Sequence, residues 1–296
     1  MASLQISDDD IPRLDGKVAI ITGAATGIGF AAARIMAIKG ATVHVLDIKP
    51  QSESELTSEI VAELPSLRYR QCNVASWRDL LQAFEAAGSV DIAIANAGVS
   101  EEQHSDYFED RFDSEGKLVQ SSWTVLDVNY RAVLDFVKIA WSNMRKHQTE
   151  GSIVITTNSS GKAALVGLVR ALRSKIIQDN ITINAVAPSG TETPSMVPEF
   201  YRSMVDIGVP VSKPHIVGLA LVYSAIAREV RMVDLYGKDS QSDLWVEGRW
   251  NGRCILTLGD KYTEVEQSTS DLKPYWFGQD NVRITKRQQA ATDYRM

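Results

Sequence analysis

A glycine-rich segment near the N-terminus has the composition and position of a phosphate-binding turn. Residues 22–29 read TGAATGIG; they follow the apolar run 17–22 and open the segment 27–39, whose apolar residues recur at helical spacing. Glycines let the backbone approach a pyrophosphate closely, and the first helical turn presents free N–H groups and the positive end of the helix dipole. A turn that needs glycine only for its geometry is the simpler alternative. The segment predicts a dinucleotide phosphate site that contains Gly23, Thr26, Gly27, Ile28 and Gly29.

The next apolar run ends near an acidic residue whose carboxylate can bind the ribose of a nucleotide. Asp47 lies near the end of residues 42–48, and the dinucleotide fold places a carboxylate about 20 residues beyond its glycines. A carboxylate accepts hydrogen bonds from ribose hydroxyls and repels a 2′-phosphate, so Asp47 favours NAD as the cofactor. Lys49 lies nearby and weakens that repulsion, so NADP is retained as the second choice. The alternative is a solvated acid at the end of a strand.

These motifs need a sheet that brings the ends of several strands together. Short apolar runs read as strands at 17–22, 42–48, 67–74, 90–95, 151–157, 181–187 and 252–258. Segments of helical period lie at 27–39, 54–64, 76–87, 122–147, 162–178 and 215–230. This alternation predicts an α/β fold: a doubly wound parallel sheet of the Rossmann type, with helices on both faces. We expect a single domain over residues 14–260, a flexible N-terminus over 1–13, and a polar C-terminal extension over 261–296 that is disordered from residue 286.

The bulk composition excludes several classes of partner. The chain has 296 residues and a formal net charge of −6, and its basic residues are spread out, so neither nucleic acid nor a membrane is expected as a partner. Cys72 and Cys254 are too few for a disulfide framework, which indicates a reducing, cytoplasmic location. The histidines lack ligand spacing, so no metal site is expected, and His44 is interpreted as a packed core residue.

Further polar motifs follow the glycine-rich segment along the chain. Residues 73–74 read Asn-Val, 96–98 read Asn-Ala-Gly, Asn129 lies in WTVLDVNYRAV, and 188–193 read PSGTET. Together with residues 22–29, this series resembles the short-chain dehydrogenase/reductase family over about residues 14–260. The general character of the chain resembles fungal reductases of specialised metabolism.

The resemblance implies additional cofactor contacts, a small-molecule substrate and a homo-oligomer. Similar proteins form dimers or tetramers through the helices that correspond to residues 122–147 and 162–178. Asn129 matches an asparagine with a structural and catalytic role. The residues that the resemblance places against the cofactor are Asn73, Val74, Asn96, Ala97, Gly98, Arg131, Pro188, Thr191 and Thr193.

One part of the family pattern is missing from this chain. Family members carry Tyr-x-x-x-Lys at the start of the fifth helix, where residues four apart share a face and the lysine both holds the nicotinamide ribose and activates the tyrosine as a general acid. Lys162 matches that lysine by its distance from Asn184, but the residue four positions earlier is Asn158, which carries no titratable proton. About a dozen residues of the connection are absent. Ser159 and Ser160 remain, either as donors toward a substrate oxygen or as helix-cap residues.

The motifs allow more than one function. The favoured one is an NAD(P)-dependent oxidoreductase that transfers a hydride between nicotinamide and a small-molecule carbonyl, alcohol or imine. Its catalytic residues would be Lys162, Asn129, Ser159 and Ser160. The alternatives are a non-redox enzyme such as a cyclase or isomerase, a cofactor-binding protein with impaired catalysis, and a sequence that has lost a short coding segment. Tyr130 and Tyr201 are weaker candidates for a replacement acid.

Overall fold

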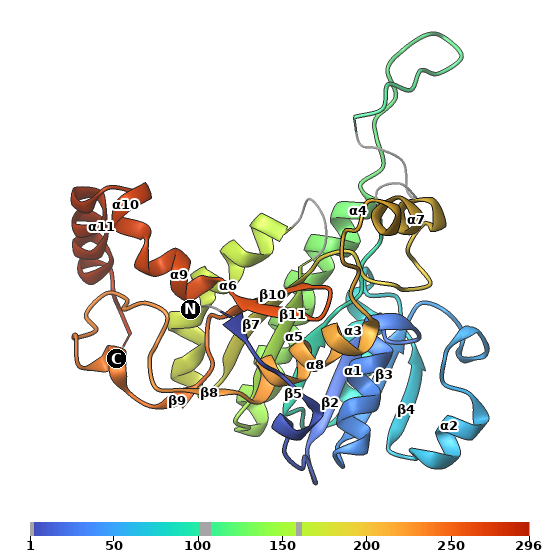
Figure 1. Cartoon of the computed structure of the whole chain (residues 1–296), viewed down its shortest axis with the longest axis horizontal. Helices are drawn as coiled ribbons and strands as arrows, with labels where there is room; N and C mark the ends of the chain where they lie inside the picture. Colours follow the sequence, from blue (N-terminus) through green and yellow to red (C-terminus); the bar gives the residue numbers. More distant parts are fainter. Residues whose placement is uncertain (1–2, 101–107, 158–161, 296) are drawn as a thin grey trace.

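A sheet of nine strands runs through the centre of the computed structural model, which describes residues 3–100, 108–157 and 162–295 (Figure 1). The strand order is β1-β11-β10-β7-β6-β5-β2-β3-β4. The strands from β10 to β4 are all parallel to their neighbours. They are β10 (Cys254–Leu258), β7 (Thr182–Pro188), β6 (Ser152–Thr156), β5 (Ile92–Ala95), β2 (Val18–Thr22), β3 (Thr42–Asp47) and β4 (Leu67–Gln71). At one edge, β11 (Lys261–Glu264) and β1 (Ser3–Leu4) add antiparallel pairs.

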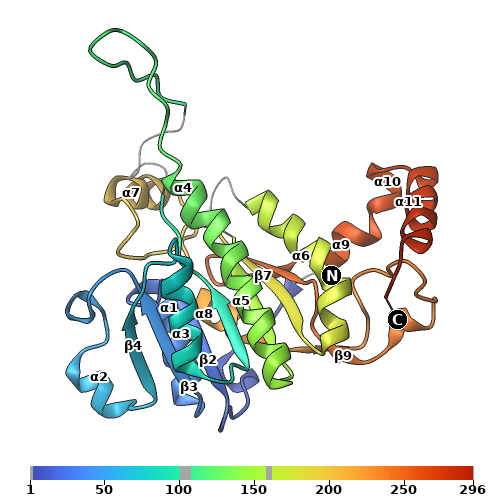
Figure 2. The same ribbon diagram turned by 180° about the vertical axis from the view of Figure 1, so that it is seen from behind.

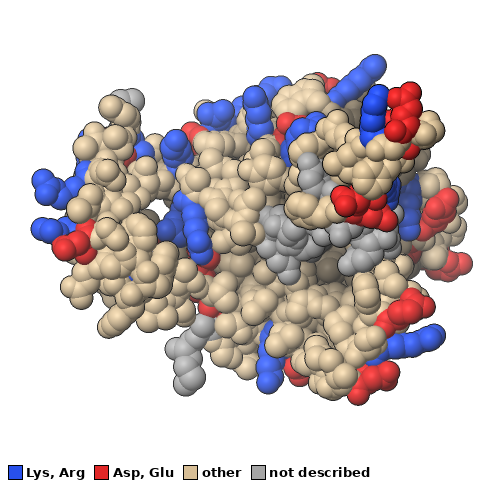
Figure 3. Space-filling model, turned by 90° about the horizontal axis from the view of Figure 1, so that it is seen from above, with Lys and Arg blue, Asp and Glu red and all other residues tan. Residues whose placement is uncertain are grey.

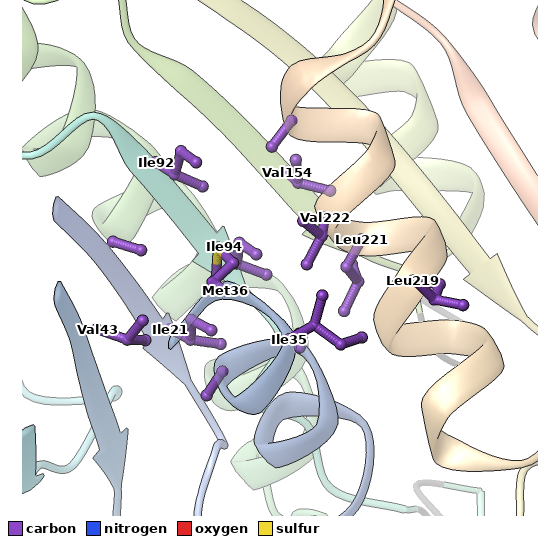
Figure 4. Close-up of a cluster of buried hydrophobic side chains, with 14 of the residues drawn as sticks. Ile21, Ile35, Met36, Val43, Ile92, Ile94, Val154, Leu219, Leu221 and Val222 are labelled. Atoms are coloured by element: carbon purple, nitrogen blue, oxygen red, sulfur yellow. The ribbon is translucent and has the colours of Figure 1, made fainter. Parts of the chain in front are cut away.

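Helices cover both faces of this sheet, which is why its central strands carry mostly apolar residues on both faces. Ile20 and Ile21 are both fully buried, yet they belong to separate core clusters on opposite faces. Ile21 belongs to the cluster that includes residues of α1 (Gly27–Ile38) and α8 (Pro214–Ile226), and Figure 4 shows it beside α1. The cluster of Ile20 includes residues of α3 (Trp77–Ala87), α5 (Ala132–His147) and α6 (Lys162–Ile176). The predicted parallel α/β fold with helices on both faces is therefore confirmed.

Shorter elements connect these layers and cover their ends (Figure 2). They are α2 (Ser58–Glu63), α4 (Thr124–Leu126), α7 (Pro198–Asp206), α9 (Glu266–Asp271), α10 (Lys273–Trp276), α11 (Gln279–Ala291) and the small ribbon of β8 (Arg228–Glu229) with β9 (Gly248–Arg249). None of the helices in the described ranges is long and apolar enough to cross a membrane.

Several expected elements are shorter or less regular in the structure. Segment 122–147 is not one regular helix, because a π-helical turn over Asp127–Arg131 separates α4 from α5. The helix expected at 54–64 begins at Ser58, where the Thr57 hydroxyl caps it by accepting a hydrogen bond from the Ile60 N–H. The strand expected over 67–74 ends at Gln71, because the Asn73 side chain accepts a bond from the Ala75 N–H at 3.0 Å and turns the chain.

The C-terminal segment is folded, so the prediction of disorder from residue 286 is wrong for the described residues. Helix α11 continues to Ala291, and the Asp293 carboxylate accepts a hydrogen bond from the Lys238 N–H at 3.0 Å. Arg295 donates to the Tyr236 carbonyl oxygen at 2.6 Å and to Asp239 at 2.7 Å. These bonds attach the tail to a loop that precedes β9. In addition, β1 lies within residues 1–13 and β11 lies beyond residue 260, so both outer segments add strands to the central sheet.

We predict that Gly218→Ala destabilises the fold at the crossing of α1 and α8. A Cβ atom at this position would lie 2.9 Å from the Ala32 backbone nitrogen and 3.0 Å from the Ala31 Cβ. Overpacking of this kind costs about 1–3 kcal/mol. The control is Gly167→Ala in the exposed part of α6, where an added Cβ meets nothing within 4 Å and the change should stabilise by about 0.5–1 kcal/mol. Thermal unfolding checks both, and similar midpoints for the two variants would contradict the packing argument.

Candidate cofactor cleft and active site

The phosphate loop joins β2 to α1 through glycines that have no room for a side chain. Gly23 has a φ of +62°, and a Cβ added there would lie 2.6 Å from the Ala97 Cα. At Gly29 an added Cβ would lie 2.8 Å from the Ala24 Cα and 2.7 Å from the Asn96 Nδ2. The loop therefore packs directly on the turn that follows β5. This close approach places the N-terminus of α1 at the carboxyl edge of the sheet, where first-turn N–H groups lack intrahelical partners.

Asn96 holds this junction together rather than pointing freely at a ligand. Its side chain is buried and donates to the carbonyl oxygens of Thr22 and Gly23 at 3.2 and 2.9 Å. Its Oδ1 accepts a bond from the Thr156 hydroxyl at 3.1 Å. The Thr22 hydroxyl in turn accepts from the backbone N–H groups of Asn96 and Ala97. Three neighbouring strands, β2, β5 and β6, are thus tied together at their carboxyl ends.

Two carboxylates bind the amides of the phosphate loop. Asp47 accepts a hydrogen bond from the Ala25 N–H at 3.0 Å, and Glu55 accepts one from the Gly27 N–H at 2.7 Å. Glu55 is held in place because its own N–H donates to the Ala25 carbonyl oxygen at 2.8 Å. The sequence marks Asp47 but not Glu55, because no periodicity or motif distinguishes a residue in the irregular segment before α2.

A cleft of about 410 Å³ opens along this edge, within the size range of small-molecule sites. The predicted residues that line it are Gly23, Thr26, Gly27, Ile28, Asp47, Asn73, Val74, Asn96, Ala97, Gly98 and Thr193. The other lining residues are Ile48, Lys49, Cys72, Val99, Val128, Pro194 and Ser195, none of which was predicted to contact the cofactor. Figure 3 views the molecule from above this edge and shows acidic and basic side chains interspersed on this face.

The two ends of the cleft come from segments that are distant in sequence. Gly27 of the phosphate loop faces Thr193, whose Cγ2 lies 3.1 Å from the position of an added Cβ on the glycine.

A cysteine thiol also lines the cleft. Burial raises the pKa of the Cys72 thiol to about 11, so this thiol is protonated at neutral pH. Neither Cys72 nor Cys254 forms a disulfide, and both residues are buried.

Asn129 lies in the π-helical turn and anchors the loop that follows β5. Its side chain is buried, accepts from the Val99 N–H at 2.9 Å and donates to the Val99 carbonyl oxygen at 2.8 Å. Both polar atoms of the side chain are therefore engaged by the backbone. A π turn inserts a wider hydrogen-bonded loop into a helix and often marks a functional site. Here it lies directly beside the cleft, because Val128 of the same turn lines it.

Several predicted residues lie outside the lining of the cleft, among them Gly29. Arg131 is bound to Asp127 at 2.8 Å, lies 3.6 Å from Asp135, and donates to the Ala75 carbonyl oxygen at 3.4 Å. Thr191 is buried and donates to the Ser189 carbonyl oxygen at 2.9 Å. Pro188 is the last residue of β7. Asn129, as described above, reaches the cleft only through Val99.

The residues nearest the missing Tyr-x-x-x-Lys pattern are only partly described. Asn158, Ser159 and Ser160 lie outside the described residues. Lys162 begins helix α6, and the structure does not describe its side chain. Of the weaker candidates for an acid, Tyr130 packs against the core cluster beneath α5, and Tyr201 lies on α7.

His44 is a buried residue of β3 and does not line the cleft. Burial, and then the positive charges of Arg68 and Arg70, lower the pKa of its imidazole. The imidazole is therefore neutral at pH 7, and its Nε2 has no hydrogen-bond partner among the described residues. The described ranges hold no cluster of His, Cys, Asp and Glu that could bind a metal ion.

Comparison with known proteins assigns this fold and cleft to a family. The sequence model described as "short chain dehydrogenase" matches residues 17–202. "Short-chain dehydrogenase/reductase prx4" of Penicillium rubens is 47% identical over an alignment that covers 100% of this chain and 90% of the relative. "Short-chain dehydrogenase/reductase ATR7" of Stachybotrys chlorohalonatus is 45% identical, with 100% and 95% covered. The crystal structure of a short-chain type dehydrogenase/reductase from Mycobacterium marinum matches with a TM-score of 0.63 at 22% identity, over 86% of this chain and 98% of that one.

The chain belongs to the short-chain dehydrogenase/reductase family. It is an oxidoreductase of that family, and the family's cofactors are the nicotinamide dinucleotides. The alignment with the Penicillium rubens relative runs over 308 positions, more than the 296 residues of this chain, so the relative carries residues that this chain lacks.

The residues present fit a nicotinamide dinucleotide. The glycine cradle would be filled by a side chain at Gly23 or Gly29, and the N–H groups of the first turn of α1 suit a pyrophosphate. Asp47 ends β3 at the position where the dinucleotide fold uses an acid for the ribose.

We predict that Asn96→Asp weakens both the fold and dinucleotide binding. The variant keeps the size of the side chain but replaces the Nδ2 donor with an oxygen that faces the carbonyl oxygens of Thr22 and Gly23. Loss of buried hydrogen bonds of this kind costs about 1–3 kcal/mol. Thermal unfolding with and without NADH measures both effects. Asn281→Asp on the exposed surface of α11 is the control. An Asn96→Asp variant as stable as this control would refute the role of the Asn96 side chain in joining β2 to the turn that follows β5.

Proposed function

We propose that this oxidoreductase uses NAD in preference to NADP. The supporting observation is the pair of carboxylates, Asp47 and Glu55, bound to the amides of Ala25 and Gly27. A 2′-phosphate beside Asp47 would bring further negative charge to a loop that already holds two carboxylates, and like charges at short range repel. Lys49 is exposed in the same region and offsets only part of that charge.

In this proposal, Glu55 also competes with an anionic cofactor for an amide of the phosphate loop. Its carboxylate lies at the N-terminus of α1, where a pyrophosphate would also bind the helix amides. Cofactor binding then requires the Glu55 side chain to move from the Gly27 N–H, while its backbone stays attached through Ala25. Glu55 thus stabilises the free loop and opposes an anionic ligand at the same amide.

We further propose that the enzyme acts on a carbonyl, alcohol or imine group of a small molecule in specialised metabolism, as a cytoplasmic homo-oligomer. Nicotinamide supplies or accepts the hydride when bound. Lys162, at the start of α6, would hold the nicotinamide ribose, and Ser159 and Ser160 would donate hydrogen bonds to the substrate oxygen. Asn129 would act as a positioning residue, because its side chain holds the backbone of Val99 at the wall of the cleft.

The missing tyrosine limits which substrates are reduced quickly. A general acid contributes about 10²–10⁴-fold to the rate. A ketone needs a proton as its oxygen gains charge, whereas an iminium carbon accepts hydride without one. The chain's own residues therefore favour an electrophile that is already cationic. We propose that some of the residues that the Penicillium rubens relative carries and this chain lacks belong to the connection before Lys162.

The cofactor preference can be tested by fluorescence titration of the wild type and of Asp47→Asn and Glu55→Gln with NADH and NADPH. We expect the wild type to bind NADH more tightly. Each substitution should strengthen NADPH binding by roughly 5- to 30-fold, since it removes about 1–2 kcal/mol of repulsion. Glu53→Gln is the control, because this nearby acid is exposed and, within the described residues, its carboxylate has no hydrogen bond or ion pair with the phosphate loop. A wild type that binds both dinucleotides equally would reject the preference.

Hydride transfer itself is tested with 4-deuterated NADH and a panel that contains a cyclic iminium ion, an aldehyde and a ketone. We expect deuterium in the reduced iminium product, at a rate about 10²-fold or more above that for the ketone. Mass spectrometry of the products measures the transfer. Tight NADH binding without label in any product would instead support a non-redox enzyme or a cofactor-binding protein.

A further inference from the structure

Two residues beyond the end of a strand form the wall of the cofactor cleft beside Asp47. Strand β3 ends at Asp47, which lies opposite Gln71 in the register with the edge strand β4 (Figure 1). Ile48 and Lys49 follow, and both are exposed and line the cleft. Because they lie outside the ladder of β3 with β4, their backbone polar groups must find partners among side chains or water.

Two side chains of β4 bind the carbonyl groups of this segment. The Tyr69 hydroxyl donates a hydrogen bond to the Lys49 carbonyl oxygen at 2.7 Å. The Gln71 Nε2 donates one to the Ile48 carbonyl oxygen at 2.8 Å. The edge strand therefore fixes two successive carbonyl groups at the rim of the cleft, although neither Tyr69 nor Gln71 belongs to the described lining of the cleft.

Packing of its ring makes the Tyr69 hydroxyl a well-placed donor. The ring is partly buried and packs against the core cluster that contains Ile21. Burial, and then the negative charges of Asp47 and Glu53, raise the pKa of Tyr69 to about 12. The hydroxyl therefore keeps its proton at physiological pH and can donate to the Lys49 carbonyl oxygen throughout that range.

The Asp47 carboxylate is bound by the backbone on both of its oxygens. Its Oδ1 accepts a hydrogen bond from the Lys49 N–H at 3.1 Å, and its Oδ2 accepts one from the Ala25 N–H at 3.0 Å. The Asp47 carbonyl oxygen also accepts from the Cys72 N–H at 2.7 Å. An ionised carboxylate has about four lone-pair sites, so these two bonds to its oxygens leave capacity for the hydroxyls of a ribose.

One peptide group connects Gln71 to the Asp47 carboxylate. The Ile48 carbonyl group and the Lys49 N–H belong to the same peptide unit, which is rigid and planar. Gln71 holds the oxygen of this unit, and its N–H donates to Asp47. Tyr69 holds the next carbonyl group along the chain. The direction of the Asp47 carboxylate thus depends on two side chains of the neighbouring strand.

We propose that Tyr69 and Gln71 are positioning residues for the cofactor ribose, because they fix the peptide group that orients the Asp47 carboxylate. This inference rests on the proposed role of Asp47 at the ribose. A carboxylate that is already oriented binds the ribose hydroxyls without a further loss of side-chain freedom. It also cannot turn away from a 2′-phosphate, so the same two contacts increase the discrimination against NADPH.

Fluorescence titration of Tyr69→Phe and Gln71→Met with NADH and NADPH tests this role. We expect each variant to weaken NADH binding by about 2- to 12-fold, the range for one net hydrogen bond, and to lower the ratio of the NADPH to the NADH dissociation constant. Tyr275→Phe is the control, because this tyrosine of α10 is 85% exposed, and it should bind both dinucleotides as the wild type does. Thermal unfolding without ligand checks that each variant is folded at the temperature of the titration.

A double-mutant cycle separates positioning from a general loosening of the segment. Asp47→Ala removes the carboxylate, and in this background Tyr69→Phe should change NADH affinity by about 2-fold at most. Equal effects of Tyr69→Phe in both backgrounds would overturn the inference, and so would wild-type NADH binding in both Tyr69→Phe and Gln71→Met. A wild type that binds NADH and NADPH equally would reject only the cofactor preference, because the coupling between Tyr69 and Asp47 is measured with NADH alone.

Discussion

The cofactor cleft depends on one close approach, between the end of β2 and the turn that follows β5. Gly23 and Gly29 have no space for a side chain, and Asn96 joins the two backbones through the carbonyl oxygens of Thr22 and Gly23. Without this contact, the N-terminus of α1 would not stand over the carboxyl edge of the sheet. The parallel sheet supplies the rest, because buried residues on both of its faces fix the strands in register.

The charges of the cleft follow from that geometry. Once the loop amides are exposed at one place, carboxylates can bind them, and Asp47 and Glu55 do so from two different segments. The same amides are the natural partners of a pyrophosphate, so the chain's own acids compete with an anionic ligand there. The π-helical turn at Asn129 completes the cleft wall from a third segment.

At the end of the molecule that carries the C-terminus, hydrogen bonds and ion pairs of the tail fix the structure. There the tail folds back through Asp293 and Arg295, and the antiparallel strands β11 and β1 extend the sheet edge. The polar composition that suggested disorder instead supplies ion pairs, such as Arg231 with Asp271 at 2.7 Å.

The amino-acid sequence by itself determined the parallel α/β fold, and it predicted a phosphate loop and an acid for the ribose. Each of these depends on local patterns: apolar runs, helical period, and glycines between a strand and a helix. Only the tertiary structure decided that Glu55 binds the loop, that a π turn interrupts the helix at Asn129, and that Arg131 and Thr191 lie outside the cleft lining. These features arise from contacts between segments that are far apart in sequence or from small shifts of backbone hydrogen bonding, and neither leaves a periodic signal. The folding of the tail could not be predicted from the sequence for the same reason, since the partners of Arg295 lie more than fifty residues earlier in the chain.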